Sequence, residues 1–545
     1  MTSRPLPLFA TALTLALSAC ADDGDSAPAG TGDSGSETGA ADTSTGEVDP
    51  DDGTTASMST GMPDDADTGS TTGEPLTRLE AIHRGLNIAM FQCTGRAWPG
   101  ITGNIQSSQI LLVSEDEATA YLWNDQQLGA VPPELTEVDF ASLGPEWLST
   151  FGVGIYNDVV TLGISLDDTA ETNALLEEAG VPPWHDYALN LAFHEGMHFL
   201  SGQGDWNVMP GSRSLPYPEP WQPRYLRAEL GWALRTELEA GTSELGPAAF
   251  WRETVRELYA DDMNAIAAYD ITEGSAEYGS AMMSALADLG CDATDDELVD
   301  AVIERLDIYA SLSRYSGGRE PYDLGVLAGL HLQRLEPNGW QSFVENGTTM
   351  QALLFAQSEP GVEPDNAERQ AEAQTAVDAR NVIAAERIEP MLLDMADPDF
   401  YRLPIPFSWI QGSFSPGGFY YLADDPQQTQ ILLSYSALHL STGGTEIDVD
   451  ALTSIVGVAN PCAVGPGIVL LLPASAVADN DDGTVTSSDE QVVFEDLTAT
   501  VIEDGDALPW LCPEELAAHP PNPGLLGAVG ISESGRPFVL ELPLP

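Results

Sequence analysis

A short segment around residue 194 carries two histidines and a glutamate at a spacing that suits metal chemistry. It contains the run His-Glu-Gly-Met-His, with histidines at 194 and 198 and Glu195 between them. The apolar periodicity around this run, followed by a Ser-Gly stop, predicts a helix over residues 186–200. Histidines four positions apart project from one face of a helix, so His194 and His198 can bind the same metal ion.

Zinc is the metal that this pattern favours. Zinc held by three protein ligands keeps a water molecule in its fourth position and lowers the pKa of that water towards 7. A glutamate next to the first histidine can take the proton of this water, which makes Glu195 the candidate general base. The alternative is that His194 and His198 are ordinary core or surface histidines of a helix. His185 lies about half a turn out of phase with His194 and is not expected to be a ligand.

A third ligand is required, and Glu273 is the first candidate. Residues 272–278 read Thr-Glu-Gly-Ser-Ala-Glu-Tyr. This run resembles the second active-site helix of the gluzincin metallopeptidases, the broad group that includes thermolysin and the bacterial collagenases, where it is often written E-G-x-A-x-Y. The resemblance implies that Glu273 binds zinc and that Glu277, one turn later, orients a zinc histidine. The 75 residues from His198 to Glu273 exceed the spacing in many gluzincins, and an inserted helix over residues 224–240 would account for this.

Asp205 is the second candidate for the third ligand. The stretch from His198 to Asp205 faintly resembles the metzincin pattern H-E-x-x-H-x-x-G-x-x-H/D with its later Met-turn. Gly202 and Asp205 each fall one residue late, however, and Met209 follows Asp205 too closely. We therefore expect Glu273, rather than Asp205, to complete the site.

Farther along the chain, residues 321–331 resemble a downstream gluzincin helix that begins with Y-x-x-G. In these enzymes a downstream Tyr or His donates a hydrogen bond to the oxyanion of the tetrahedral intermediate. The resemblance implies this role for Tyr322, with His331 as second choice. Nine residues apart on one helix, the two side chains should face opposite ways. A packing role for Tyr322 at the start of a helix is the alternative.

The N-terminus predicts export and lipid anchoring. Residues 1–19 combine Arg4 with a short apolar stretch, and Leu-Ser-Ala-Cys at 17–20 matches a bacterial lipobox. Cys20 would then be lipidated and become the mature N-terminus, which places the protein in the cell envelope, at the outer membrane or cell surface. A secretory signal with a chance cysteine is the alternative. No later segment reaches 18 uninterrupted apolar residues, so the lipid would be the only anchor.

The charge of the chain restricts its partners. The 545 residues carry a formal net charge of −67, and all 19 basic residues are arginines. Residues 20–75 hold 14 of the acidic residues and almost no large apolar residue, which predicts a disordered stalk. A chain this acidic is not expected to bind nucleic acid or an anionic membrane surface. A peptide or protein substrate that is not strongly acidic fits this field.

The fold class expected is α+β. Residues 76–398 should form a mainly helical, gluzincin-like metallopeptidase domain with a small N-terminal sheet, and residues 399–545 a β-rich accessory domain. Helices are expected over residues 76–90, 186–200, 224–240, 248–268, 274–289, 295–311, 324–335 and 367–395. Strands are expected over residues 109–113, 118–123 and 159–164, and in the second domain over 418–422, 430–435, 467–472 and 538–542.

Four cysteines follow Cys20, and an even number in an exported chain indicates two disulfides. Three pairings are possible. We favour Cys93–Cys291 and Cys462–Cys512, which place one disulfide inside each expected domain.

The sequence therefore predicts a Zn²⁺-dependent enzyme that hydrolyses peptide bonds and is carried on a surface lipoprotein. Two other functions stay open. One is a non-catalytic binding or adhesion protein that keeps a peptidase fold, and the other is a zinc hydrolase of a non-peptide carbonyl substrate.

Overall fold

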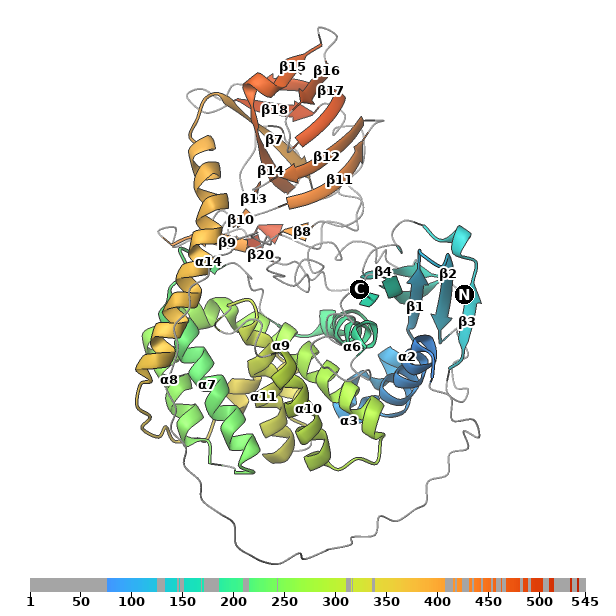
Figure 1. Ribbon diagram of the computed structural model, residues 1–545, viewed down its shortest axis with the longest axis vertical. Helices are drawn as coiled ribbons and strands as arrows, with labels where there is room; N and C mark the ends of the chain where they lie inside the picture. The colour runs from blue at the N-terminus through green and yellow to red at the C-terminus, as the bar shows by residue number, and fades with distance from the viewer. Residues whose placement is uncertain are drawn as a thin grey trace, which may run out of the picture.

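The computed structural model describes residues 76–538 with gaps, of which the longest span residues 125–132, 171–185, 407–414, 424–430 and 514–529. The predicted signal peptide, Cys20, the stalk and His185 lie outside the described residues. Figure 1 shows a helical body with a small sheet at one side, and a larger sheet joined to the body by a long helix. The mixture of helices and sheets confirms the α+β class. Within the described part of the chain, no helix is both long and apolar enough to cross a membrane.

The N-terminal part packs short helices on a five-stranded sheet. Helix α2 (Arg78–Leu86) continues as a π-helical turn (Asn87–Gln92), so the helix expected over 76–90 forms with small shifts at its ends. The strand order is β3-β2-β1-β5-β4, in which only the β1–β5 pair is parallel. The sheet contains β1 (Gln109–Ser114), β2 (Thr119–Trp123), β3 (Leu135–Val138), β4 (Phe151–Tyr156) and β5 (Val159–Ser165).

The three strands predicted here are confirmed as β1, β2 and β5. Strands β3 and β4 were not expected. Strand β3 lies at an edge of the sheet, where its middle residues are exposed and polar, and β4 contains two glycines, which weaken a strand pattern.

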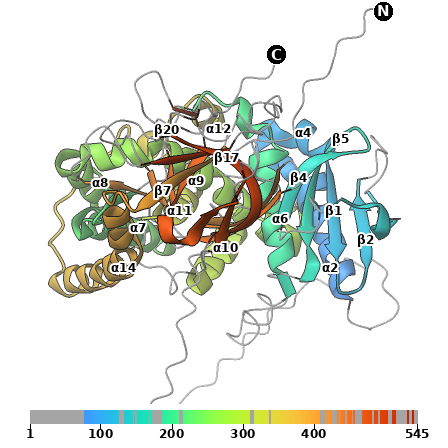
Figure 2. The same cartoon turned by 90° about the horizontal axis from the view of Figure 1, so that it is seen from above.

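The two candidate metal histidines lie on helix α6 (Tyr187–Phe199), at the side of the helical body that faces the small sheet. Helix α6 contacts α9 on one side and β5 on the other, and Figure 2 shows it between the small sheet and the rest of the body. The other helices are α7 (Trp221–Glu239), α8 (Gly246–Leu258), α9 (Ala260–Leu289), α10 (Asp295–Tyr309), α11 (Glu320–Leu335), α12 (Gln341–Glu345), α13 (Met350–Leu354) and α14 (Ala367–Asp394).

Residues 248–289 form two helices, as predicted, but the break between the helices lies at a different residue. The chain breaks at Tyr259, where φ is −136° and ψ is 45°, and α9 then runs without interruption through the expected gap at 269–273. Gly274 was read as a helix start, but it serves the packing of α9 on α11. A Cβ atom on Gly274 would lie 3.1 Å from the Pro321 carbonyl oxygen and 3.2 Å from the Cα of Gly325. The two helices therefore approach with glycine against glycine.

Helix α11 begins four residues earlier than expected. The prediction placed its start at Leu324, whereas the helix begins at Glu320 and so includes Pro321 and Tyr322. Proline in the first turn costs the helix no hydrogen bond, which explains why the helix extends this far.

The C-terminal part forms a 13-stranded sheet. The strands expected at 418–422, 430–435 and 467–472 are confirmed as β9 (Phe419–Leu422), β10 (Ile431–Leu433) and β14 (Gly467–Pro473). Of the strand expected at 538–542, β20 (Pro537–Phe538) includes only residue 538, and the rest lies outside the described residues. The remaining strands of the large sheet are β6 (Leu215–Tyr217), β7 (Phe400–Pro406), β8 (Ser415–Pro416), β11 (Ser436–Thr442), β12 (Thr445–Ala451), β13 (Ser454–Val456), β15 (Val477–Asp479), β16 (Thr484–Ser488), β17 (Val492–Ile502) and β18 (Trp510–Pro513).

Strand β6 connects the two expected domains. It lies in the sequence between α6 and α7, within the helical region, yet it pairs in parallel with β9 at the edge of the large sheet. Long helix α14 joins the same two parts (Figure 1) and contacts β6, where the Tyr217 hydroxyl lies 3.3 Å from Oε1 of Glu389.

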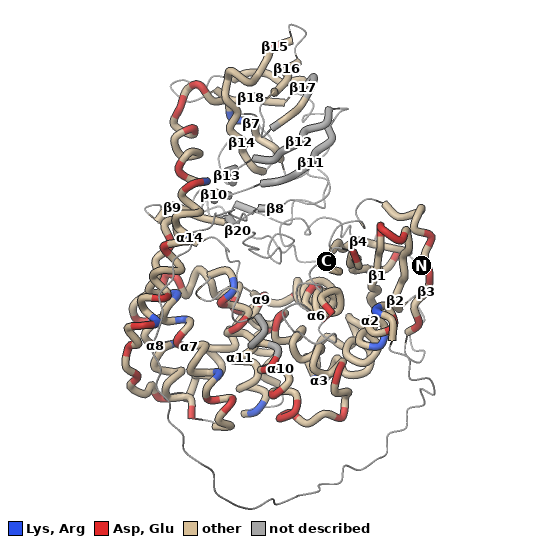
Figure 3. The backbone as a smooth tube through the Cα atoms, in the orientation of Figure 1, with Lys and Arg blue, Asp and Glu red and all other residues tan. Residues whose placement is uncertain are grey.

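Both predicted disulfides are present. The Cys93–Cys291 disulfide joins the N-terminal helices to the chain just after the end of α9. The Cys462–Cys512 disulfide lies within the C-terminal part. Figure 3 shows acidic residues at many positions along the helices, with the few arginines scattered among them.

Candidate metal site

Helix α6 holds its functional residues in a buried and well-fixed position. Asp186 caps its N-terminus by accepting hydrogen bonds from the backbone N–H groups of Ala188 and Leu189, and it also pairs with Arg78 at 2.7 Å. His194 is 6% exposed and Glu195 is 1% exposed. The site thus forms on the buried face of a short helix whose start is anchored.

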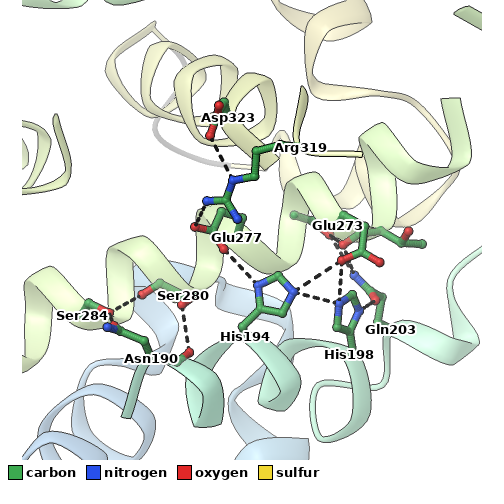
Figure 4. Close-up of polar contacts among 12 residues, drawn as sticks. Asn190, His194, His198, Gln203, Glu273, Glu277, Ser280, Ser284, Arg319 and Asp323 are labelled. Atoms are coloured by element: carbon green, nitrogen blue, oxygen red, sulfur yellow. Dashed lines mark hydrogen bonds and ion pairs between the residues drawn. The ribbon is translucent and has the colours of Figure 1, made fainter. Parts of the chain in front are cut away.

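Hydrogen bonds fix the position of α6 along α9. The Ser280 hydroxyl donates to the backbone carbonyl of Asn190 at 3.2 Å, and Ser284 donates to the side-chain oxygen of Asn190 at 2.7 Å (Figure 4). Small residues on α9 allow this approach, since a Cβ on Gly279 would lie 2.7 Å from the sulfur of Met197. These contacts set the register of α6 along α9. In this register Glu273 of α9 faces the two histidines of α6.

Three side chains meet at one point. The Nε2 atoms of His194 and His198 lie 3.2 Å apart, and Oε2 of Glu273 lies 3.4 Å from the first and 3.1 Å from the second. Figure 4 shows the three groups converging from α6 and α9. Ligand atoms in a tetrahedral zinc site, each about 2.0–2.1 Å from the ion, lie about 3.3 Å from one another. The three atoms can therefore hold a metal ion, and their spacing fits zinc.

The Nδ1 atom of each histidine forms a hydrogen bond, which fixes the tautomer of the ring. The Nδ1 of His194 lies 3.0 Å from Oε2 of Glu277, and the Nδ1 of His198 lies 2.7 Å from Oε1 of Gln203. A carboxylate oxygen and an amide oxygen only accept hydrogen bonds, so both Nδ1 atoms donate. Both Nε2 lone pairs are then directed at the common point, as a metal site requires.

Gln203 itself is held firmly. Its amide nitrogen donates to the Thr272 carbonyl and to the Ser275 hydroxyl, both at 2.9 Å, so its orientation is set by α9. The chain reaches this position through Gly202, whose φ of +84° is the left-handed conformation that favours glycine. Sequence reasoning used Gly202 as a helix stop and in the metzincin comparison, and it missed Gln203. A glutamine directly after such a reversal is a weak signal by itself.

Glu277 belongs to a second group of contacts above His194. Arg319 Nη2 lies 3.4 Å from Oε1 of Glu277, and its Nε lies 3.6 Å from Asp323. The Arg319 guanidinium also lies 4.9 Å from the ring centre of Tyr322. The Tyr322 ring in turn stacks on His194, with centroids 5.6 Å apart and an interplanar angle of 14°. Arg319 thus links Glu277 with Tyr322, and sequence reasoning did not identify it.

Helix α7, the predicted insertion, helps to hold α11 in place. Arg227 of α7 contacts Glu320 at 2.7 Å and Asp270 at 2.6 Å, and Arg224 contacts Glu320 at 2.9 Å. Both arginines are buried. These ion pairs join the start of α11, next to Arg319, to the segment of α9 that precedes Glu273.

The other sequence candidates lie elsewhere. Asp205 is exposed in a short 3-10 turn and is not part of the metal group. His331 lies on α11 but faces α7, where its Nε2 is 2.9 Å from the Leu234 carbonyl. Burial lowers the pKa of His331 to about 4, so this ring is neutral and donates to the carbonyl. Tyr322 and His331 therefore do face opposite ways.

Comparison of the chain with known protein families, curated proteins and solved structures finds no match. What the protein does is therefore inferred from the residues of the site.

Proposed function

We propose that this protein is a zinc-dependent hydrolase of peptide bonds. The observation that carries the proposal is the meeting of two imidazole nitrogens and one carboxylate oxygen at 3.1–3.4 Å, with both Nδ1 atoms already engaged. Two imidazoles and one carboxylate suit zinc, whereas calcium and magnesium prefer oxygen ligands throughout. His194, His198 and Glu273 would hold the ion.

The protein's own residues would divide the chemistry among them. A bound zinc ion would supply a water of lowered pKa and polarise the substrate carbonyl. Glu195, next to His194 and almost fully buried, would take a proton from the attacking water and pass it to the leaving amine. Tyr322, whose ring stacks on His194, would donate a hydrogen bond from its hydroxyl group to the developing oxyanion. Glu277 and Gln203 would keep the two imidazoles oriented.

The substrate we propose is a peptide or protein segment without strong negative charge. The chain has a formal net charge of −67, and Figure 3 shows acidic residues over the helices that surround the site. A field of this sign raises the local concentration of cationic or neutral substrates over acidic ones. Cleavage of a basic peptide should therefore lose its advantage over an acidic one at high ionic strength.

We also propose that the mature protein begins at a lipidated Cys20 and is tethered to the bacterial cell envelope. The lipobox at 17–20 supports this placement. The two disulfides are typical of a compartment that oxidises cysteines. Metabolic labelling with a radioactive fatty acid should mark the wild type but not Cys20→Ala, and equal labelling of both would contradict the anchor.

Two variants test the metal and the chemistry separately. Purified His194→Ala should contain less than a tenth of the zinc of the wild type, and equal zinc in both would refute the metal site. Glu195→Ala should retain zinc but lose cleavage across a mixed peptide library. A wild type that holds zinc and cleaves no peptide would instead favour a binding protein or a hydrolase of another carbonyl substrate, and a panel of ester substrates separates these two.

A further inference from the structure

A pocket apart from the metal group lies among helices α7 and α8 and the segment that leads into α14. Its volume is about 690 Å³, within the range of small-molecule sites. Two tryptophans, Trp232 of α7 and Trp251 of α8, line it together with several acidic residues. None of the residues that line it belongs to the metal group.

Glu237 is one of the acidic residues that line this pocket. It is 6% exposed, and its Oε1 accepts one long hydrogen bond of 3.4 Å, from the backbone N–H of Ala248. Its Oε2 is buried and has no hydrogen-bond partner among the described residues. Burial raises the pKa of Glu237 to about 7, and the nearby Glu363 adds to this effect. A buried carboxylate of this kind is costly to fold unless a donor pairs with it.

A second acidic residue of the pocket already shows what kind of donor fits. Glu229 is 2% exposed and forms a bidentate pair with Arg369, with both contacts at 2.5 Å. The Arg369 guanidinium also lies over the Trp232 ring, 4.2 Å from its centroid. One buried carboxylate in this pocket is thus matched by a cation that rests on an aromatic face, whereas Glu237 is matched by no such cation within the described structure.

The charges that line the pocket also favour a cationic ligand. Four carboxyl groups line the pocket, from Glu229, Glu237, Glu363 and Asp365, against the single guanidinium of Arg369. The apolar lining includes the partly buried indole of Trp232 and the buried indole of Trp251, together with alanines and prolines, and such a lining favours a ligand with an apolar body. A carboxylate beside an aromatic face is the arrangement that binds organic cations.

We propose that this pocket binds a small organic cation, in which an ammonium group pairs with Glu237 and an apolar body packs against the indoles. The site is separate from the metal group and does not depend on its activity. A metal cation is the poorer fit, because the tryptophans and Arg369 occupy places where oxygen ligands would be needed.

Binding of 2-phenylethylammonium to the full chain, measured by isothermal titration calorimetry at pH 8, tests this proposal. Its neutral analogue 2-phenylethanol has nearly the same shape and provides the reference ligand. The ammonium compound should bind at least tenfold more tightly than the alcohol, since a charge-assisted hydrogen bond contributes more than a neutral one. Glu237→Gln keeps the shape of the side chain and should reduce the affinity for the ammonium compound at least tenfold.

Glu359→Gln is the matched control, because it removes an exposed carboxylate from the chain segment next to the pocket. This variant should bind the ammonium compound as the wild type does. Circular dichroism of both variants establishes that they are folded. Equal affinity for the amine and the alcohol, unchanged binding in Glu237→Gln, or an equal loss in Glu359→Gln would each overturn the proposal, as would no binding at all.

Discussion

Replacing Gln203 by alanine should weaken zinc binding without removing any ligand. The substitution deletes the acceptor 2.7 Å from Nδ1 of His198 and both donor contacts to α9. His198 is then no longer held in the tautomer that directs its Nε2 lone pair at the metal position. Partners of metal-bound histidines typically contribute a factor of about 10–100 in affinity, or about 1.4–2.7 kcal/mol. We expect the zinc dissociation constant of Gln203→Ala to rise by that factor.

Competition with a chelator of known zinc affinity, at constant pH, measures this constant. Gln106→Ala is the control, because Gln106 is a partly buried glutamine whose amide donates to the Phe91 carbonyl instead. Gln203→Glu separates the two functions of the side chain. Its carboxylate still accepts from His198, so zinc affinity should be at least that of the wild type. Loss of the two donor contacts should nevertheless lower the melting temperature. A dissociation constant for Gln203→Ala within twofold of the wild type would refute the assigned role.

Three further predictions concern the packing of α9 on α11, the disulfides and the pocket that contains Glu237. Gly325→Ala should destabilise the fold by about 2 kcal/mol or more and lower zinc content, because its Cβ would lie 2.2 Å from the Cα of Gly274, next to Glu273. Replacing Cys93 and Cys291 by alanine should cost up to about 5 kcal/mol in urea unfolding, since the disulfide closes a loop of 198 residues. In the folded chain the pKa of Glu237 is about 7, above its ordinary value. The folded chain therefore favours the protonated form of Glu237. The contribution of Glu237 to the free energy of unfolding is greatest at low pH and is lost as the pH rises through 7. Glu237→Gln should be more stable than the wild type at pH 8.5, by about 2 kcal/mol once water in the pocket is allowed to screen the charge.

Each of these has its own control. Gly103→Ala, where a Cβ would meet nothing within 4 Å, should leave stability nearly unchanged, and an equal effect there would exclude the packing explanation. Loss of the shorter Cys462–Cys512 loop, with a sequence separation of 50, should cost less than loss of the longer one. For Glu237, a stability difference between variant and wild type that is the same at pH 5 and pH 8.5 would contradict the assigned cause.

The helical repeat in the sequence is enough to predict the local spacing of residues within the candidate site. His194 and His198 share one helix face because of the helical repeat, and Glu273 and Glu277 lie one turn apart for the same reason. Their contact across α6 and α9 could be expected only through the resemblance to the gluzincins. Identification of zinc and of peptide hydrolysis stays a prediction.

The residues that sequence reasoning missed depend on tertiary packing. Gln203 reaches His198 because the chain reverses at Gly202, and Arg319 reaches Glu277 because α11 packs closely on α9. Neither contact follows a period or a motif. The wrong helix boundary at Gly274 has a related cause, since a glycine reads as a break in the sequence whether it ends a helix or lets two helices approach.

Strand β6 has a consequence for the order in which the protein can fold. This strand precedes α7 in the chain, yet its partner β9 is made about 200 residues later. During synthesis or export, β6 therefore cannot pair until the C-terminal half of the chain has been made. A chain truncated after α14 would leave β6 without its neighbour β9. The two halves are in this sense one folding unit, although none of the described residues of the C-terminal sheet belongs to the metal group.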